Sequence, residues 1–168
     1  MPPISKLEAA ERNLREAIIL FFQKRDPVAI HTLAAASQQV LRDLAMAVMP
    51  EYIGFLHDHP GLRQDLSTEW KRLLNEPRNF FKHADKDVSA LIDFDEILNE
   101  ILLIDAVAIR AQVTTEPHLE SSVYAAWFEL KYPIAQGAFP GNAVLFHCRE
   151  RNIEPDDFPE FAKLCQIG

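Results

Sequence analysis

The chain has 168 residues, of which 48% are hydrophobic and 25% are charged, and its formal net charge is −8. This length and composition are typical of one globular domain, so we expect residues 1–168 to form a single domain. The acidic balance argues against general binding of nucleic acids or anionic membranes, because both need a basic surface.

Cysteine usage and hydropathy narrow the class of protein further. Cys148 and Cys165 are too few for a metal cluster, and we expect both to be reduced thiols. The N-terminal residues lack a basic stretch followed by an apolar core, so they do not have the pattern of a secretory signal. The most apolar run, residues 101–109, is about half as long as a membrane span. These features predict a cytoplasmic protein that needs no cofactor and does not contact a membrane.

Two long helices are predicted in the first 50 residues. Ser5 and Glu8 have the spacing of a capping box, and apolar residues then recur every three or four positions as far as Phe21. Asp26 and Pro27 are a helix cap followed by a first-turn proline, which ends the first helix and begins the second. A connection this short predicts that the two helices pack as an antiparallel hairpin.

Shorter helices are expected in the rest of the chain. Residues 50–61 read as a connection, and a third helix over 62–76 should be stopped by Pro77, where a new short helical segment begins. The Asp93–Glu96 segment starts a helix that is apolar on nearly every side, which is typical of a bundle centre or a subunit interface. After Pro117 we expect helices near 118–131, 140–151 and 156–166. No segment alternates like a strand, so the predicted fold is an all-α helical bundle.

Several candidate sites have simpler structural explanations. His57, Asp58 and His59 could bind a divalent metal in a hydrolase, but the sequence shows no pattern for the remaining ligands and the triplet suits a polar connector. Asp105 interrupts the apolar helix, where it either faces a cleft or, more simply, bonds a neighbouring helix. Trp70 and Trp127 have the spacing of core residues.

The segment PRNFFKHADKD, residues 77–87, carries the leading functional candidates. Five cations and two acids give residues 71–86 a net charge of +3 within an acidic chain. A helix that starts at Pro77 would add backbone donors for an anion. Asn79 and His83 are one helical turn apart, so the amide can orient the imidazole, and the long side chain of Arg78 can bend toward them. These residues predict a fixed cation and a proton-transferring base beside an anion pocket.

The run Arg78-Asn79-Phe80-Phe81-Lys82-His83 resembles the R-x4-6-H motif of the HEPN superfamily. That resemblance implies a small all-helical bundle, commonly a homodimer, and in many members a metal-independent ribonuclease. It further implies that Arg78 stabilises phosphate charge, that His83 transfers a proton during attack by the ribose 2′-hydroxyl, and that Asn79 positions the histidine. In the family, two copies of the motif often meet across the dimer interface.

Other matches leave alternatives open. A second, looser match to the R-x4-6-H motif has five residues between Arg25 and His31, but it straddles a helix boundary. The IHTLAAASQQVLRDL and NFFKHAD segments also resemble an uncharacterised group of bacterial helical proteins, which implies no activity. The leading hypothesis is therefore a ribonuclease or a module that binds RNA or nucleotide phosphate. The alternative is a non-catalytic helical module that binds a protein partner or a small ligand.

Overall fold

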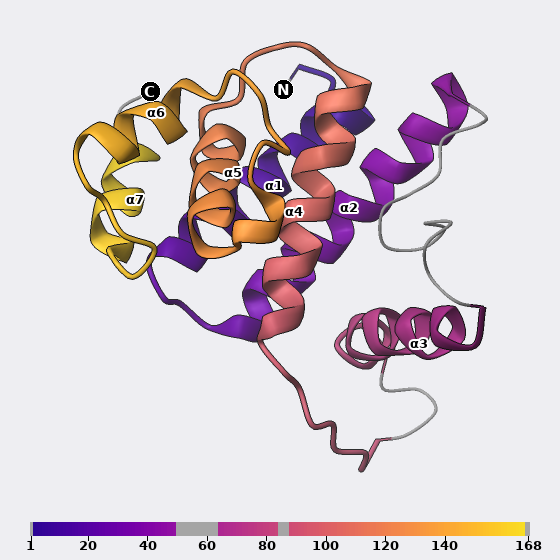
Figure 1. Ribbon diagram of the computed structural model, residues 1–168. Helices are drawn as coiled ribbons and strands as arrows, with labels where there is room; N and C mark the ends of the chain where they lie inside the picture. The colour runs from indigo at the N-terminus through magenta and orange to yellow at the C-terminus, as the bar shows by residue number, and fades with distance from the viewer. Residues whose placement is uncertain (1, 50–63, 84–87, 167–168) are drawn as a thin grey trace.

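The computed structural model describes residues 2–49, 64–83 and 88–166; the side chains of residues 64–68, 70 and 71 lie outside this description. The described residues form helices and one short 3-10 segment, and they contain no strand (Figure 1). The elements are α1 (Lys6–Phe22), α2 (Pro27–Val48), α3 (Gln64–Phe80), α4 (Ile97–Val113), α5 (Leu119–Lys131), η1 (Pro133–Ala135), α6 (Ala143–Glu150) and α7 (Phe158–Leu164). The predicted all-α fold is confirmed.

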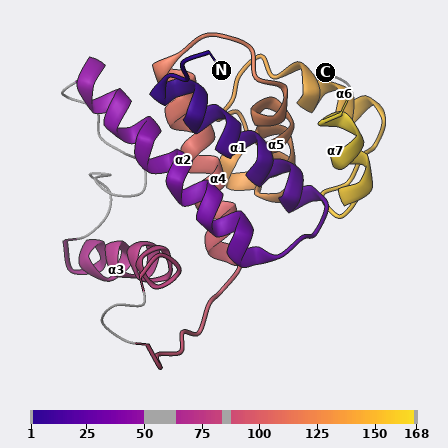
Figure 2. The same cartoon turned by 180° about the vertical axis from the view of Figure 1, so that it is seen from behind.

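The starts of α1 and α2 follow from local capping chemistry. The Ser5 hydroxyl accepts from the Glu8 N–H at 3.1 Å, and the Glu8 carboxylate accepts from the Ser5 N–H at 2.8 Å, which completes the capping box. The Asp26 carboxylate accepts from the first N–H groups of α2, with Pro27 in its first turn. α1 and α2 then pack along each other, as expected of a helical hairpin (Figures 1 and 2).

α4 lies at the centre of the bundle, in contact with α1, α2 and α5 (Figure 1). Its buried side chains include Leu98, Leu103, Val107 and Ile109, which are distributed around its circumference. This position explains why the helix is apolar on nearly every side. The same apolar surface therefore gives no separate reason for a subunit interface, and the homodimer stays a prediction.

Two buried polar pairs join α2 to α4. Gln38 donates to the Asp105 carboxylate at 2.8 Å, and the Nδ1 atom of His31 lies 3.0 Å from Oδ1 of Asn99. Asp105 is thus a buried residue bonded to a neighbouring helix, which was the simpler of its two interpretations. Buried polar pairs of this kind fix the register of the two helices, because any slip would leave both partners without hydrogen bonds.

An aromatic cluster fastens α1, α5 and α7 together. The Phe21 ring contacts Tyr124 and Trp127 edge to face, and the Phe22 ring stacks on Phe161 at 5.2 Å between centroids. Trp127 is completely buried, and its indole N–H donates to the Pro155 carbonyl at 3.0 Å. Trp127 is therefore a packing residue, as its spacing predicted.

α3 differs from the prediction at a decisive point. The helix does not stop at Pro77 but runs through it to Phe80, so no new helix begins there. The fixed φ of proline is itself helical, and its missing N–H costs one backbone bond close to the end of the helix. Pro77 is also buried beside Leu74, so tertiary packing outweighs that loss. Arg78 and Asn79 consequently lie in the last turn of a helix, not in the first.

The remaining helices agree with the prediction within a few residues. α4 begins at Ile97 instead of near Asp93, and Phe94 lies before the helix. α5, α6 and α7 correspond to the three short helices expected after Pro117. None of the described helices combines the length and the apolar character that a membrane crossing requires.

Candidate functional site

The final turn of α3 holds Arg78 in a defined position against α2. Its side chain is half-buried, and Nη1 donates to the Gln39 side-chain oxygen at 2.8 Å. Gln39 in turn donates to the Asp43 carboxylate at 2.7 Å. The Gln39 amide therefore lies between the Arg78 guanidinium and the Asp43 carboxylate. The hydrogen bond to Gln39 orients Arg78, and Asp43 does not pair with it directly.

Lys82 lies beside Arg78 and shares its surroundings. Partial burial lowers the pKa of Lys82, and the neighbouring Arg78 charge lowers it further. Within residues 2–49, 64–83 and 88–166, neither side chain forms an ion pair with a carboxylate. The same helix offers a contrast, because Arg72 is paired with Glu76 at 2.7 Å. The end of α3 thus carries two adjacent cations for which the described residues supply no carboxylate partner.

Asn79 and His83 keep the one-turn spacing that the sequence predicted. The His83 N–H donates to the Asn79 carbonyl at 3.1 Å, so the backbone turn continues past the end of α3. Both side chains are exposed, and the described structure shows no hydrogen bond between them. Arg78, Asn79 and His83 therefore share one short segment, but the expected contact between amide and imidazole is not formed.

The predicted helix N-terminus at this segment is wrong. Because Arg78 lies in the last turn of α3, the nearby free backbone groups are carbonyls, and the helix end carries partial negative charge. Any anion bound here has to be held by the side chains of Arg78 and Lys82.

His31 lies directly beneath this segment. It is completely buried, with its ring edge-to-face to Phe81 at 5.6 Å and to Phe94 at 5.0 Å. Asn99 donates its amide N–H to the Pro27 carbonyl, which turns its oxygen toward His31 and assigns the imidazole proton to Nδ1. Nε2 has no hydrogen-bond partner in the described part of the chain. Burial lowers the pKa of His31, and the Arg78 and Lys82 charges act in the same direction.

No other site expected from the sequence forms among the described residues. Arg25 is exposed in the turn before α2 while His31 is buried, so the second motif match does not form a site. His57, Asp58, His59 and the side chain of Trp70 lie outside the described residues. Among the residues that are described, no group of His, Cys, Asp and Glu has the arrangement of a metal site. Cys148 and Cys165 are both free and buried.

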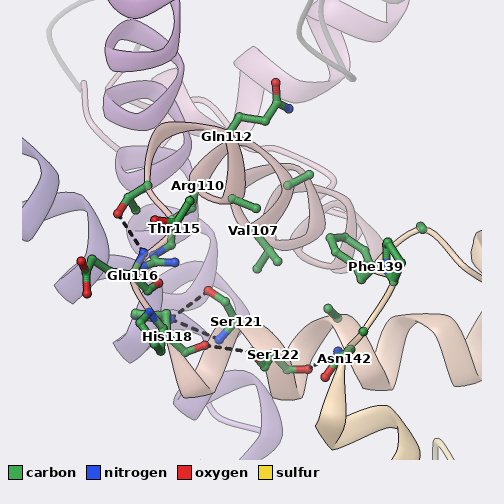
Figure 3. A pocket seen from close by; sticks show the side chains of 18 residues that line it. Val107, Arg110, Gln112, Thr115, Glu116, His118, Ser121, Ser122, Phe139 and Asn142 are labelled. Atoms are coloured by element: carbon green, nitrogen blue, oxygen red, sulfur yellow. Dashed lines mark hydrogen bonds between the residues drawn. The ribbon is translucent and has the colours of Figure 1, made fainter.

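A pocket of about 670 Å³ lies on the other side of the α2–α4 pair, where α4 ends and α5 begins. Figure 3 shows Arg110, Glu116 and His118 at one end of it, Phe139 and Asn142 at the other, and Ser121 and Ser122 along α5 between them. Val107 contributes from α4. The pocket is separate from the basic end of α3, which lies on the opposite side of α4 (Figures 1 and 2).

His118 caps α5 at the rim of this pocket. Its Nδ1 atom accepts from the Ser121 N–H at 3.2 Å and lies 2.8 Å from the Ser121 hydroxyl. An imidazole nitrogen can accept in this way only when it carries no proton. Burial lowers the pKa of His118, with a further contribution from the Arg110 charge, so the neutral form that the cap requires is favoured.

Comparison with protein-family models, with curated proteins and with solved structures finds no match to this chain.

The pocket residues were missed by sequence reasoning. Arg110 contacts Glu11, 99 positions away, and Glu129 accepts from backbone N–H groups at 137 and 139. None of these residues belongs to a short motif, and their spacing along the helices is not periodic. The sequence feature that could have indicated the pocket is its loop, since Gly137, Pro140 and Gly141 fall within five residues between two helices.

Proposed function

We propose that the segment from Arg78 to His83 binds the phosphate groups of RNA or of a nucleotide, and that it acts as a HEPN-like, metal-independent ribonuclease site. The observation that carries this proposal is the adjacent pair of cations, Arg78 and Lys82, with no carboxylate partner among the described residues. Two like charges held together without a counter-ion attract an anion such as phosphate.

The orientation of Arg78 supports the same proposal. One guanidinium nitrogen is fixed by Gln39, and the hydrogen bond leaves the other donors of the fork for a ligand. Arginine forks match the geometry of phosphate oxygens, so a positioned arginine recognises phosphate better than a mobile one.

His83 supplies the proton transfer in this proposal. Its imidazole is exposed next to the two cations, and histidine is the side chain that most often acts as a general acid or base. One His83 takes the proton of the ribose 2′-hydroxyl as its oxygen attacks phosphorus. The bond from phosphorus to the 5′ oxygen breaks, and that oxygen leaves with a proton from a second acid. The products are a 2′,3′-cyclic phosphate and a 5′-hydroxyl.

A homodimer would supply that second acid as His83 of the other copy, in keeping with the resemblance to the HEPN superfamily. We include a homodimer in the proposal for this reason, and we keep the cytoplasmic location that the sequence predicts. Light scattering at micromolar concentration tests it, and a monomer would remove the two-histidine version of the reaction.

The test of the proposal is cleavage of a single-stranded RNA oligonucleotide in the presence of a chelator. Cleavage should persist, the product should end in a 2′,3′-cyclic phosphate, and an all-deoxy oligonucleotide should stay intact. Arg78→Ala and His83→Ala should each reduce the rate by about a hundredfold or more.

The chain offers two matched controls for these variants. Arg72→Ala removes a cation of the same helix that is already paired with Glu76, and His147→Ala removes an exposed histidine of α6. Both should cleave at the wild-type rate. Wild-type protein that neither binds nor cleaves RNA would overturn the proposal, and so would an equal loss in Arg72→Ala.

A further inference from the structure

The pocket lies between α4, α5 and the loop after η1, and its walls are held in place by hydrogen bonds between buried side chains and the backbone. Glu129 is 4% exposed, and its two carboxylate oxygens accept from the N–H groups of Gly137 at 2.7 Å and Phe139 at 3.0 Å. A buried carboxylate is costly unless it is hydrogen-bonded, so this one stabilises a single shape of the loop. Phe139 is held against the pocket by that shape.

The opposite wall is fixed in a similar way. Arg110 is 5% exposed, pairs with Glu11 at 2.5 Å, and donates to the Glu116 carbonyl at 3.0 Å. Asn142 donates to the carbonyl of Ser122, a residue of α5, at 2.9 Å and also caps α6. The backbone around the pocket is therefore organised by polar groups before any ligand arrives, which is the usual property of a small-molecule site.

The two glycines of the loop are required by its conformation. Gly137 and Gly141 have φ values of 83° and 79°, where other residues are strained. A Cβ atom at either position would meet nothing within 4 Å, so space is not the reason for glycine. The loop thus adopts a specific turn on both sides of Phe139 and Pro140, two residues that line the pocket.

The lining combines a small apolar surface with hydrogen-bonding groups. Val107, Ala111 and Ala125 come from the two helices, and the Phe139 ring comes from the loop. Ser122 contributes a polar group from α5 on the same lining. Figure 3 shows Val107 and Phe139 on the α4 and loop sides of the space, with Ser122 on the α5 side. A ring can therefore contact the apolar residues while a polar group of the same molecule faces α5.

The buried charges around the pocket are balanced within the protein. The guanidinium of Arg110 is neutralised by Glu11, and His118 is favoured in its neutral form by burial. The Glu116 carboxylate belongs to an exposed residue at the rim. A charged ligand would lose hydration without gaining a counter-ion in the interior.

We propose that this pocket binds a small uncharged molecule that combines an aromatic or aliphatic ring with an amide or hydroxyl group. The ring lies against Val107, Ala111 and Phe139, and the polar group faces α5. This site is independent of the phosphate site on α3.

A matched series of probes tests both the site and the ligand class. Benzamide, benzoate and benzylamine share a ring and differ in charge, and each can be titrated into ¹⁵N-labelled full-length protein. Benzamide should shift the amide resonances of residues 107–125 and 138–142, with benzoate and benzylamine at least about tenfold weaker. Equal shifts by all three probes would overturn the ligand class. No shift at these residues up to the solubility limit of benzamide would overturn the site.

A pair of variants separates pocket binding from surface binding. Ala111→Phe fills the pocket from an exposed position of α4, while Ala47→Phe makes the same change at an exposed position of α2 outside it. Ala111→Phe should abolish the benzamide shifts and Ala47→Phe should keep them. Arg78→Ala should also keep them, so a failure of the phosphate proposal is distinguishable from a failure of this one. Retained binding in Ala111→Phe would contradict the proposal.

Discussion

The attachment of α3 and the packing of α5 differ in kind. α5 is held by a cluster of aromatic rings in which Trp127 is completely buried. Among the described residues, α3 is held by the buried Leu74 and Pro77, by the hydrogen bond from Arg78 to Gln39, and by the edge of Phe81, just after its end, against His31. It leaves Leu73 and Phe80 more than a third exposed. The basic residues that we assign to phosphate binding thus lie on the less firmly packed of the two elements. Weakly held elements open locally at low free-energy cost, which suits a surface that has to receive a large ligand.

The largest expected effect tests this contrast directly. Trp127→Ala should lower the free energy of unfolding by about 3–5 kcal/mol, because it removes a buried ring and leaves a cavity. Phe81→Ala should cost only about 1–2 kcal/mol, because that ring is half-buried. Urea denaturation of both variants measures the difference. Equal losses would mean that α3 is as firmly packed as α5.

A smaller effect is expected where a polar contact lies in the firmly packed region. Glu129→Ala leaves the Gly137 and Phe139 N–H groups without their acceptors and should cost about 1–3 kcal/mol. Glu150→Ala, at an exposed position of α6, serves as the control and should change stability by less than about 0.5 kcal/mol. Thermal unfolding compares the two, and a neutral Glu129→Ala would show that the loop holds its shape without the carboxylate.

Lower pH should destabilise both α3 and the start of α5, and hydrogen exchange can measure the two effects separately. The pKa values of His31 and His118 are lowered in the folded protein from the ordinary value of 6.5. The unfolded state therefore binds more protons between the lowered and the ordinary value. Stability is complete above about pH 6.5, falls as the pH drops from there toward the lowered values, and levels off below them.

The two histidines affect different elements. Protonated His31 would place a third positive charge beside Arg78 and Lys82, so protection of the α3 amides should fall as the pH drops below about 6.5. Protonated His118 would lose its acceptor for the Ser121 N–H, which loosens the start of α5. His118→Asn keeps an acceptor at this cap without a titrating ring and should reduce the loss at α5 only. Protection factors that do not change with pH at either element would contradict this assignment.

The smallest effect is expected at the proposed phosphate site. Arg78→Ala removes one partly exposed hydrogen bond and Gln39→Ala removes that bond and the one to Asp43, and each variant should change the free energy of unfolding by less than about 1 kcal/mol. Circular dichroism melting measures this change. A loss as large as that of Glu129→Ala would show that Arg78 serves mainly to fasten α3.

Helix boundaries that depend on neighbouring residues were predictable from the sequence. The capping box at Ser5 and the Asp26–Pro27 boundary use side chains that bond their own backbone within three residues, so the pattern contains the whole interaction. The same holds for the three short helices after Pro117, whose ends agree with the structure within a few residues.

Features that depend on tertiary contacts were not predictable in this way. Pro77 has the local signal of a helix end, but its burial allows α3 to continue, and this moved Arg78 from a helix start to a helix end. The proposed anion site consequently has its two cations but not the backbone donors that the sequence predicted. The pocket depends on Glu11, Arg110 and Glu129, whose partners are fixed by the fold and not by sequence spacing.

The two cysteines have a practical consequence. Both thiols are buried; burial raises the pKa of Cys148, and burial together with the Glu120 charge raises that of Cys165 to about 12. Since only the thiolate reacts readily, the folded protein should resist alkylating reagents at neutral pH. Cys165 lies at the end of α7 and Cys148 within α6, and both belong to the buried core. The rate of alkylation therefore measures how often this end of the molecule opens.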